Sequence, residues 1–342
     1  MKDRYNYLDA IRGIAALSVV LFHYTLNVRS EVESSLFGHY YYLLLDDYFD
    51  LGKWGVIMFF MLSGMLIPYS IKGDTLLDIK IFSIGRFFRL YPVYWISVLI
   101  GGVIFHKEIS VILVNLSMFQ QFIGIENVIG LYWTLQIELI FYFLIAFGFY
   151  FKCLKEERNQ FYAAVFFMMI SLVFAFLRYW LEMKLPIAAP LAISIMLFGT
   201  IWKRHVLDRS ILAKKYVRKY IVFFVPALIL TCHFGYSLDF GYNENPVKYF
   251  LTYSLGVLSF CVLSDRVKIG GAFFVYLGRI SYSLYLFHPI IWELVEGMNF
   301  KSILIEIFVS IILTIFVSHV LYELVERTFI KIGKAVVNTL SR

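Results

Sequence analysis

Long apolar stretches recur along the whole chain and are separated by short polar segments. Ten of these stretches are long enough to cross a membrane as helices, which takes about 20 mostly apolar residues each. A further stretch from Val111 to Gly124 is interrupted by Asn115 and two glutamines, so we predict an interfacial or re-entrant helix there. The ten predicted spans are 8–27, 52–71, 87–105, 131–151, 161–180, 187–203, 220–236, 248–264, 273–293 and 302–325.

Composition supports a membrane protein. Hydrophobic residues make up 61% of the chain and charged residues 16%, whereas soluble domains carry about 25% charged residues. A soluble protein of this composition would expose large apolar patches and aggregate. The three cysteines form neither a disulfide framework nor a metal-ligand pattern, so we expect no metal. We predict an all-α integral membrane protein, a single transmembrane domain over residues 1–342 with no appended soluble domain.

The distribution of positive charge predicts the orientation. The net charge of +7 could indicate nucleic-acid binding, but most of the 31 lysines and arginines lie on alternate loops. Such residues accumulate on cytoplasmic loops, so the pattern places both termini in the cytoplasm and requires no nucleic acid. We therefore predict a multi-pass protein of the inner (cytoplasmic) membrane, in contact with membrane lipids.

The first predicted span carries two ionisable side chains, Arg12 and His23. They are eleven positions apart, so they share one helix face with an axial separation of roughly 16 Å. Asp9 lies one turn before Arg12 and can pair with it. Ionisable residues inside a membrane usually face the bundle interior and mark functional sites. The alternatives are a snorkelling anchor for Arg12 and an interfacial histidine for His23.

Further charged residues fall at matching depths in other spans. Arg86 and Arg89 lie one turn apart at the inner surface, where two guanidinium groups suit a phosphate, although ordinary positive-inside anchoring also explains them. Glu138 lies about as deep as His23 from the outer side. A carboxylate that orients a histidine is a recurring catalytic arrangement, so we expect these two to pair. The alternative for Glu138 is a structural hydrogen bond between helices.

The ninth predicted span places Arg279 toward the inside and His288 toward the outside. Ser281 and Tyr285 share a face with His288. Packing contacts between helices explain this group as well as a direct role does.

Several segments, taken in order, resemble the acyltransferase-3 family of bacterial membrane O-acyltransferases. An R-x10-H signature of that family falls on Arg12 and His23, and an RxxR signature falls on Arg86 and Arg89. The resemblance implies a ten-helix domain, an acyl-CoA co-substrate at the cytoplasmic face and transfer to a hydroxyl of an envelope polysaccharide or glycolipid. Acetyl-CoA is the default donor from the resemblance alone. The matching segments are "YLDAIRGIAALSVVLFHY", "FFMLSGML", "GRFFRLYP", "YWTLQIELIFYFL" and "GRISYSLYLFHP".

These observations together suggest an O-acetyltransferase that modifies a polysaccharide of the cell envelope. In this hypothesis His23 and Glu138 are catalytic, and His23 acts as general base or as nucleophile. Acyl-CoA is bound by the arginines, and the acceptor is a carbohydrate or glycolipid. A transporter or flippase for a glycan or lipid-linked sugar remains an alternative, because buried ionisable residues also line transport paths. The proposed cofactor-binding residues are Arg12, Arg86, Arg89 and Arg279.

Overall fold

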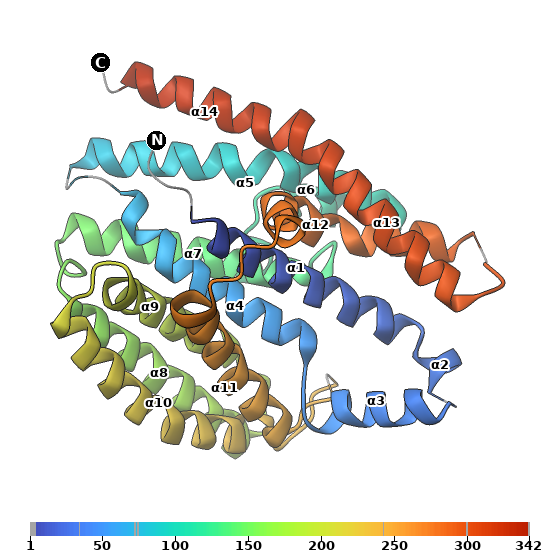
Figure 1. The fold of residues 1–342 in the computed structure, drawn as a ribbon, viewed down its shortest axis with the longest axis horizontal. Coiled ribbons are helices and arrows are strands. Elements are labelled where there is room, and N and C mark those ends of the chain that lie inside the picture. The colour runs from blue at the N-terminus through green and yellow to red at the C-terminus, as the bar shows by residue number, and fades with distance from the viewer. Residues whose placement is uncertain are drawn as a thin grey trace.

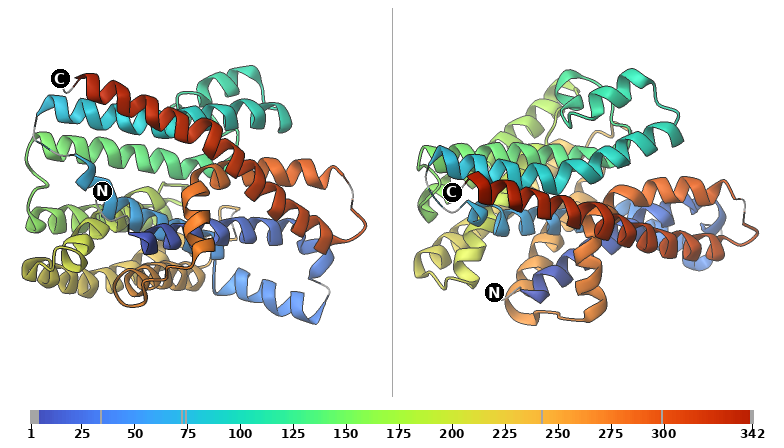
Figure 2. Two further views of the ribbon diagram at one scale, coloured as in Figure 1. Left: turned by 45° about the horizontal axis from the view of Figure 1, so that its top comes forward. Right: turned by 90° about the horizontal axis from the view of Figure 1, so that it is seen from above.

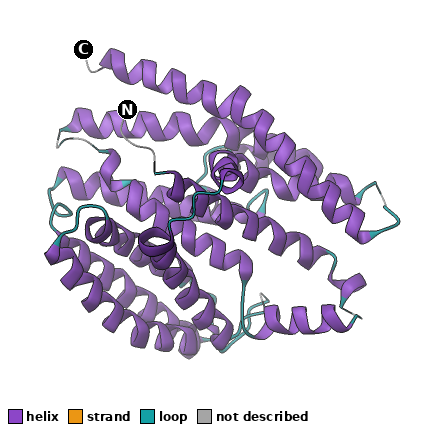
Figure 3. Cartoon of the chain, in the orientation of Figure 1, coloured by secondary structure: helices purple, strands orange, loops and turns teal. Residues whose placement is uncertain are grey.

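The computed structural model of the chain describes residues 5–33, 35–71, 73, 75–241, 243–298 and 300–340. Every regular element in these ranges is helical (Figure 3). The α-helices are α1 (Asn6–Asn27), α2 (Arg29–Val32), α3 (Leu36–Asp47), α4 (Leu51–Leu66), α5 (Leu76–Ile104), α6 (Ile109–Asn115), α7 (Trp133–Tyr150), α8 (Glu157–Leu181), α9 (Ala188–Val206), α10 (Ile211–Tyr236), α11 (Pro246–Val262), α12 (Ala272–Glu296), α13 (Ile303–Leu321) and α14 (Arg327–Leu340). Short 3-10 helices cover Pro68–Ser70, Gln120–Ile123 and Gly130–Tyr132, and π-helical turns cover Leu263–Val267 and Tyr322–Glu326.

Eight helical segments of the described ranges are long and apolar enough to cross a membrane. The prediction of an all-helical membrane protein is therefore confirmed, whereas the count of ten spans and the cytoplasmic termini stay predictions. The predicted spans 187–203 and 273–293 are not among the eight, but they do form helices, α9 and α12. All residues from Pro190 to Trp202 in α9 are buried. The two helices are less apolar on average because α9 ends in Lys203, Arg204 and His205 and α12 contains Arg279, His288 and Glu293.

The helices form a bundle with distinct ends. Figure 1 shows the N- and C-terminal ends of the described chain at the same end of the molecule, while α2 and α3 lie at the opposite end. The views in Figure 2 show the same arrangement.

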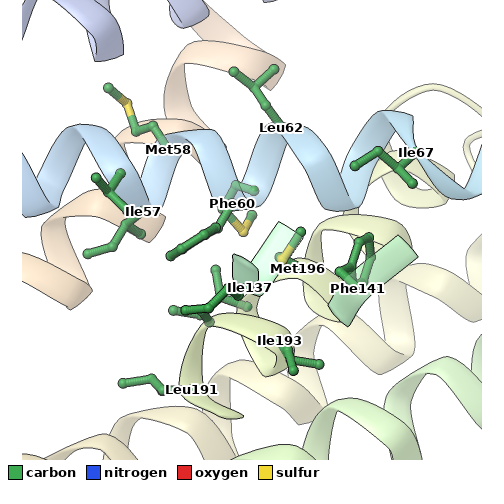
Figure 4. Packing of buried hydrophobic residues seen from close by; sticks show 14 of the residues in the cluster. Ile57, Met58, Phe60, Leu62, Ile67, Ile137, Phe141, Leu191, Ile193 and Met196 are labelled. Atoms are coloured by element: carbon green, nitrogen blue, oxygen red, sulfur yellow. The ribbon is translucent and has the colours of Figure 1, made fainter. Parts of the chain in front are cut away.

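The main apolar core surrounds α4. Phe60 of α4 lies on the side that faces α7 and α9, near Ile137 and Met196, and Leu62 points to the other side of α4 (Figure 4). Packing at interior density makes each of these contacts sensitive to side-chain volume. The core thus fixes α4 and α7, which carry Ser63 and Glu138.

The stretch from Val111 to Gly124 does not form a spanning helix. It contains α6, only seven residues long, and the 3-10 helix Gln120–Ile123. The buried Asn115 side chain donates to the carbonyl oxygens of Val111 and Glu126 and accepts from the amide of Val128. A polar side chain therefore satisfies backbone groups in this short excursion, as the interrupted apolar pattern suggested.

Helices α1 and α12 approach each other most closely at two glycines. A methyl group on Gly13 would lie 2.1 Å from the carbonyl oxygen of Phe274, and one on Gly278 would lie 1.8 Å from that of Asp9. Small residues of this kind let helix backbones come together in membranes. Gly13 and Gly278 are separated by the same number of residues as His23 and His288, which are also in contact, so the two helices run parallel in one register.

Gly278→Ala should lower stability, because the added methyl group meets backbone that cannot move independently. We expect a loss of at least about 1 kcal/mol, seen as a lower Tm in detergent, as for other overpacked contacts. Gly85→Ala is the matched control: Gly85 is also helical, but open space surrounds it. Higher helix propensity should make that variant more stable by about 0.5–1 kcal/mol. Equal Tm changes in the two variants would contradict the close contact.

Candidate active site

A pocket of about 160 Å³ lies among α1, α4, α5, α7 and α12. Its charged residues are Arg12 from α1, Arg86 and Arg89 from α5, and Glu138 from α7. Four of the residues singled out from the sequence are thus brought together, although they come from three separate parts of the chain. The remaining lining residues are Val56, Phe59, Phe60, Leu62, Ser63, Leu66, Ile67, Leu90, Thr134, Leu135, Ser281, Tyr282 and Tyr285.

The three arginines give the pocket an excess of positive charge. Arg12 donates a hydrogen bond to Asp9 across 3.2 Å, as the spacing predicted. The positive charge of nearby Arg89 repels that of Arg12. Arg86 lies over the rings of Phe82 and Tyr142, with its guanidinium carbon 5.3 and 5.4 Å from their centroids. Within the described ranges neither Arg86 nor Arg89 forms a salt bridge. Half-buried guanidinium groups without a carboxylate partner suit an anionic ligand, phosphate in particular.

Glu138 is the one acidic side chain on the pocket lining, and it is held by hydroxyl groups. Tyr142, one turn along α7, donates to its Oε1 across 2.5 Å. Ser63 of α4 donates to the same oxygen across a longer 3.5 Å. These partners differ from the histidine expected from the sequence. Glu138 lies on the pocket lining with the arginines, whereas His23 does not, so the expected pairing of these two residues is not formed.

His23 instead contacts a second histidine. Its Nδ1 lies 2.8 Å from the carbonyl oxygen of Val19 and 3.3 Å from Nε2 of His288. Nδ1 of His288 in turn lies 3.2 Å from the carbonyl oxygen of Leu284. His288 is completely buried.

The two carbonyl oxygens determine where the protons lie. A carbonyl oxygen only accepts, so Nδ1 of each neutral ring carries the hydrogen. Nε2 of His288 is then an acceptor and can share the Nδ1 proton of His23. Nε2 of His23 is consequently unprotonated and keeps a free lone pair. A base or nucleophile needs such a nitrogen.

An aromatic layer separates the pocket from the two histidines. Phe59 and Tyr285 are on the pocket lining and meet edge to face, with ring centroids 6.1 Å apart. The Tyr285 ring lies 6.2 Å from His288, and the His288 ring lies 5.2 Å from His23. Tyr285 also forms a hydrogen bond with Thr134 across 2.8 Å. His23 itself is not on the pocket lining.

Arg279 lies elsewhere. Its side chain is exposed and does not line the pocket, although Ser281, Tyr282 and Tyr285 of the same helix do. His288 is the group whose contact with His23 the sequence alone did not reveal. The signal that could have found it is the equal spacing from Gly13 to His23 and from Gly278 to His288.

No group of histidine, cysteine, aspartate and glutamate side chains in the described ranges could hold a metal ion.

Comparison with known families decides the class of the protein. A family model described as an acyltransferase domain, acyltransferase family 3, matches residues 5–323. The chain belongs to this family. It is thus a membrane acyltransferase, as the resemblance of its motifs implied. No curated protein and no solved structure matches it. The matched range of this acyltransferase includes the whole pocket lining and both histidines, whereas α14 lies outside it.

The charge of the pocket can be measured through a cysteine at Ser63. In a Cys153→Ser background, Ser63→Cys should react at least about tenfold faster with an anionic methanethiosulfonate than with a cationic one. The reason is that three guanidinium groups face one carboxylate, so the local potential attracts anions. Ser97→Cys, which is fully buried outside the lining, should be unreactive. Equal rates for the two reagents at position 63 would show that the pocket carries no positive potential.

Proposed function

We propose that this acyltransferase moves an acetyl group from acetyl-CoA to a hydroxyl group of an envelope polysaccharide or glycolipid. The observation that carries the proposal is the pocket with three arginines at one end and a histidine pair just beyond the other. Coenzyme A has the matching form, because a phosphorylated nucleotide is joined by a thin arm to the thioester. We further propose that the donor enters from the cytoplasmic side and that the protein lies in the inner membrane with both termini cytoplasmic.

The shared register of α1 and α12 gives the length of the pocket. In that register Tyr285 is level with Val20 of α1, eight residues beyond Arg12, or about 12 Å along the axis. The pantetheine arm extends over a comparable distance. Its amide groups can donate to Glu138, and its carbonyl groups can accept from the hydroxyl groups of Ser63 and Ser281. In this proposal Glu138 acts on the arm of the donor and not on His23.

The volume of the pocket favours a short acyl group. A cavity of about 150 Å³ takes a molecule the size of benzene. The 160 Å³ pocket therefore has room for part of the arm and an acetyl group, but not for a long fatty chain. The nucleotide of coenzyme A must lie outside, at the arginine end.

His23 is proposed as the general base. Its Nε2 takes the proton of the acceptor hydroxyl while the hydroxyl oxygen attacks the thioester carbonyl carbon. The carbon–sulfur bond then breaks, the departing thiolate takes the proton back from Nε2, and the products are the ester and free coenzyme A. During the step His23 is cationic, and its Nδ1–H donates more strongly to His288. For the thioester to reach Nε2, Phe59 or Tyr285 must change rotamer.

The same nitrogen can instead carry the acyl group, in which case His23 is a nucleophile. A single turnover with labelled acetyl-CoA and no acceptor separates the two routes, because only the nucleophilic route leaves labelled protein. The same assay with the acceptor present tests the alternative of a flippase, which would move a glycan without consuming acetyl-CoA.

His23→Ala should lower acetyl transfer at least about a hundredfold, the usual contribution of a general base, while the protein still accumulates in the membrane. His233→Ala is the control, since that histidine is exposed on α10. Transfer of labelled acetyl groups in membranes measures both variants. Undiminished transfer by His23→Ala would remove this residue from the chemistry.

Arg86→Gln and Arg89→Gln should each raise the KM for acetyl-CoA about tenfold and leave kcat within about threefold. Contacts to the nucleotide phosphates are the same before and during the reaction, so they affect binding alone. Arg279→Gln is the matched control, because it also removes an arginine from the neighbourhood but not from the pocket. An unchanged KM in both pocket variants, or an equal rise in the control, would refute the proposed binding site.

A further inference from the structure

A second hollow lies on the outside of the bundle, between α8 and α10. It is an open groove with a volume of about 620 Å³. None of its residues lines the donor pocket, and neither α8 nor α10 contributes to that pocket. The lining residues are Met169 and Leu172 of α8 together with Arg218, Lys219, Val222, Phe223, Pro226, Ala227 and Leu230 of α10.

The sequence of α10 explains the shape of the groove. Val222, Pro226 and Leu230 follow one another at every fourth position, so they form a stripe along one face. Pro226 lies inside the helix, where it removes a backbone hydrogen bond and its ring favours a kink. The side chain of the adjacent Ala227 is small, so it leaves space at the bottom of the groove. Larger apolar side chains on either side then form the walls.

Positive charge gathers at one end of this groove. Arg218 and Lys219 are on its lining, and Lys214 and Lys215 precede them by one turn. All four side chains are exposed. In the described part of the chain none of the four forms a salt bridge, so the protein supplies no neutralising carboxylate. These cations are therefore available to an anionic group from the surroundings.

The dimensions match one chain of a lipid. From Arg218 to Leu230 the groove follows twelve residues of helix, about 18 Å, and one leaflet of hydrocarbon is about 15 Å thick. A phosphate bound at Arg218 and Lys219 would leave an acyl chain lying over Val222, Pro226 and Leu230. Basic pockets between membrane helices are known to hold anionic lipid head groups. A zwitterionic lipid lacks the net negative charge that the four cations attract.

We propose that this groove is a binding site for an anionic glycerophospholipid, with its phosphate at Arg218 and Lys219 and one acyl chain along α10. The site is independent of the acyl-transfer chemistry and stands whether or not the proposed donor and acceptor are correct. The proposal means that α10 binds one specific class of lipid, in addition to the general contact of the bundle with membrane lipids.

The test is native mass spectrometry of the purified full chain in detergent, titrated with phosphatidylglycerol or with phosphatidylcholine of the same chains. We expect phosphatidylglycerol to bind at least about tenfold more tightly. The double variant Arg218→Gln/Lys219→Gln should lose about tenfold in affinity for it, since each cation near the surface contributes appreciably. Lys214→Gln/Lys215→Gln removes equal charge beside the groove and should lose less than about threefold. All four changes are at exposed positions, and an unchanged Tm confirms folding.

Two further experiments distinguish the contact with the acyl chain from the contact with the phosphate. Val222→Trp fills the groove at a position that is 75% exposed, and it should weaken phosphatidylglycerol binding while all cations remain. Inorganic phosphate at millimolar concentration should not displace the lipid, because it lacks the chain. The proposal is overturned if the two lipids bind equally, if the Arg218/Lys219 variant binds like the unchanged protein, or if free phosphate competes fully.

Discussion

The close contact of two glycines, Gly13 on α1 and Gly278 on α12, is the constraint on which the candidate active site depends. It brings the backbones of the two helices together and fixes their register. Ten residues farther along each helix, the same register places His23 against His288. A slip of one residue would turn the histidines apart, since each residue rotates the helix face by about 100°. The packing of two small residues thus determines which side chains meet deep in the bundle.

The buried and half-buried arginines of this protein differ in whether a carboxylate forms an ion pair with them. Arg178, near the end of α8, is almost completely buried and forms an ion pair with Glu244, with the ring of Phe240 4.4 Å from its guanidinium carbon. Its charge is compensated within the fold, as a structural arginine requires. Arg86 and Arg89 are half-buried, and among the described residues no carboxylate forms an ion pair with them; beside them Glu138 accepts a hydrogen bond from Tyr142. The protein therefore keeps a net positive charge in a place where solvation is poor, which is a cost that a bound anion relieves.

The sequence predicted the helices themselves, because these depend on local apolar length, but it did not predict which side chains of different helices meet. Apolar length identified the helices, including α9 and α12. Helical periodicity placed Arg12, Arg86 and Arg89 at one depth, and one pocket collects them. Glu138 was expected level with His23 but lines the same pocket as the arginines. The partner of His23 could not be derived in this way. Counting residues from the end of an apolar stretch gave Glu138 a depth that the structure does not confirm, because that helix begins and tilts in ways the apolar pattern does not define. Depth also leaves the rotation of each helix open, so the sequence did not show that Arg279 faces away from the pocket.

The aromatic layer of Phe59 and Tyr285 has a consequence for the membrane itself. A polar passage that ran unbroken from the arginines to the histidines would offer a chain of water along which protons cross down their gradient. The packed rings of Phe59 and Tyr285 lie between the pocket and the histidine pair and interrupt such a chain. With the acetyl-CoA donor proposed above, the same rings would also keep bulk water away from the thioester and so limit wasteful hydrolysis. If donor and acceptor come from opposite sides of the membrane, as proposed, the enzyme needs this barrier as much as it needs a base.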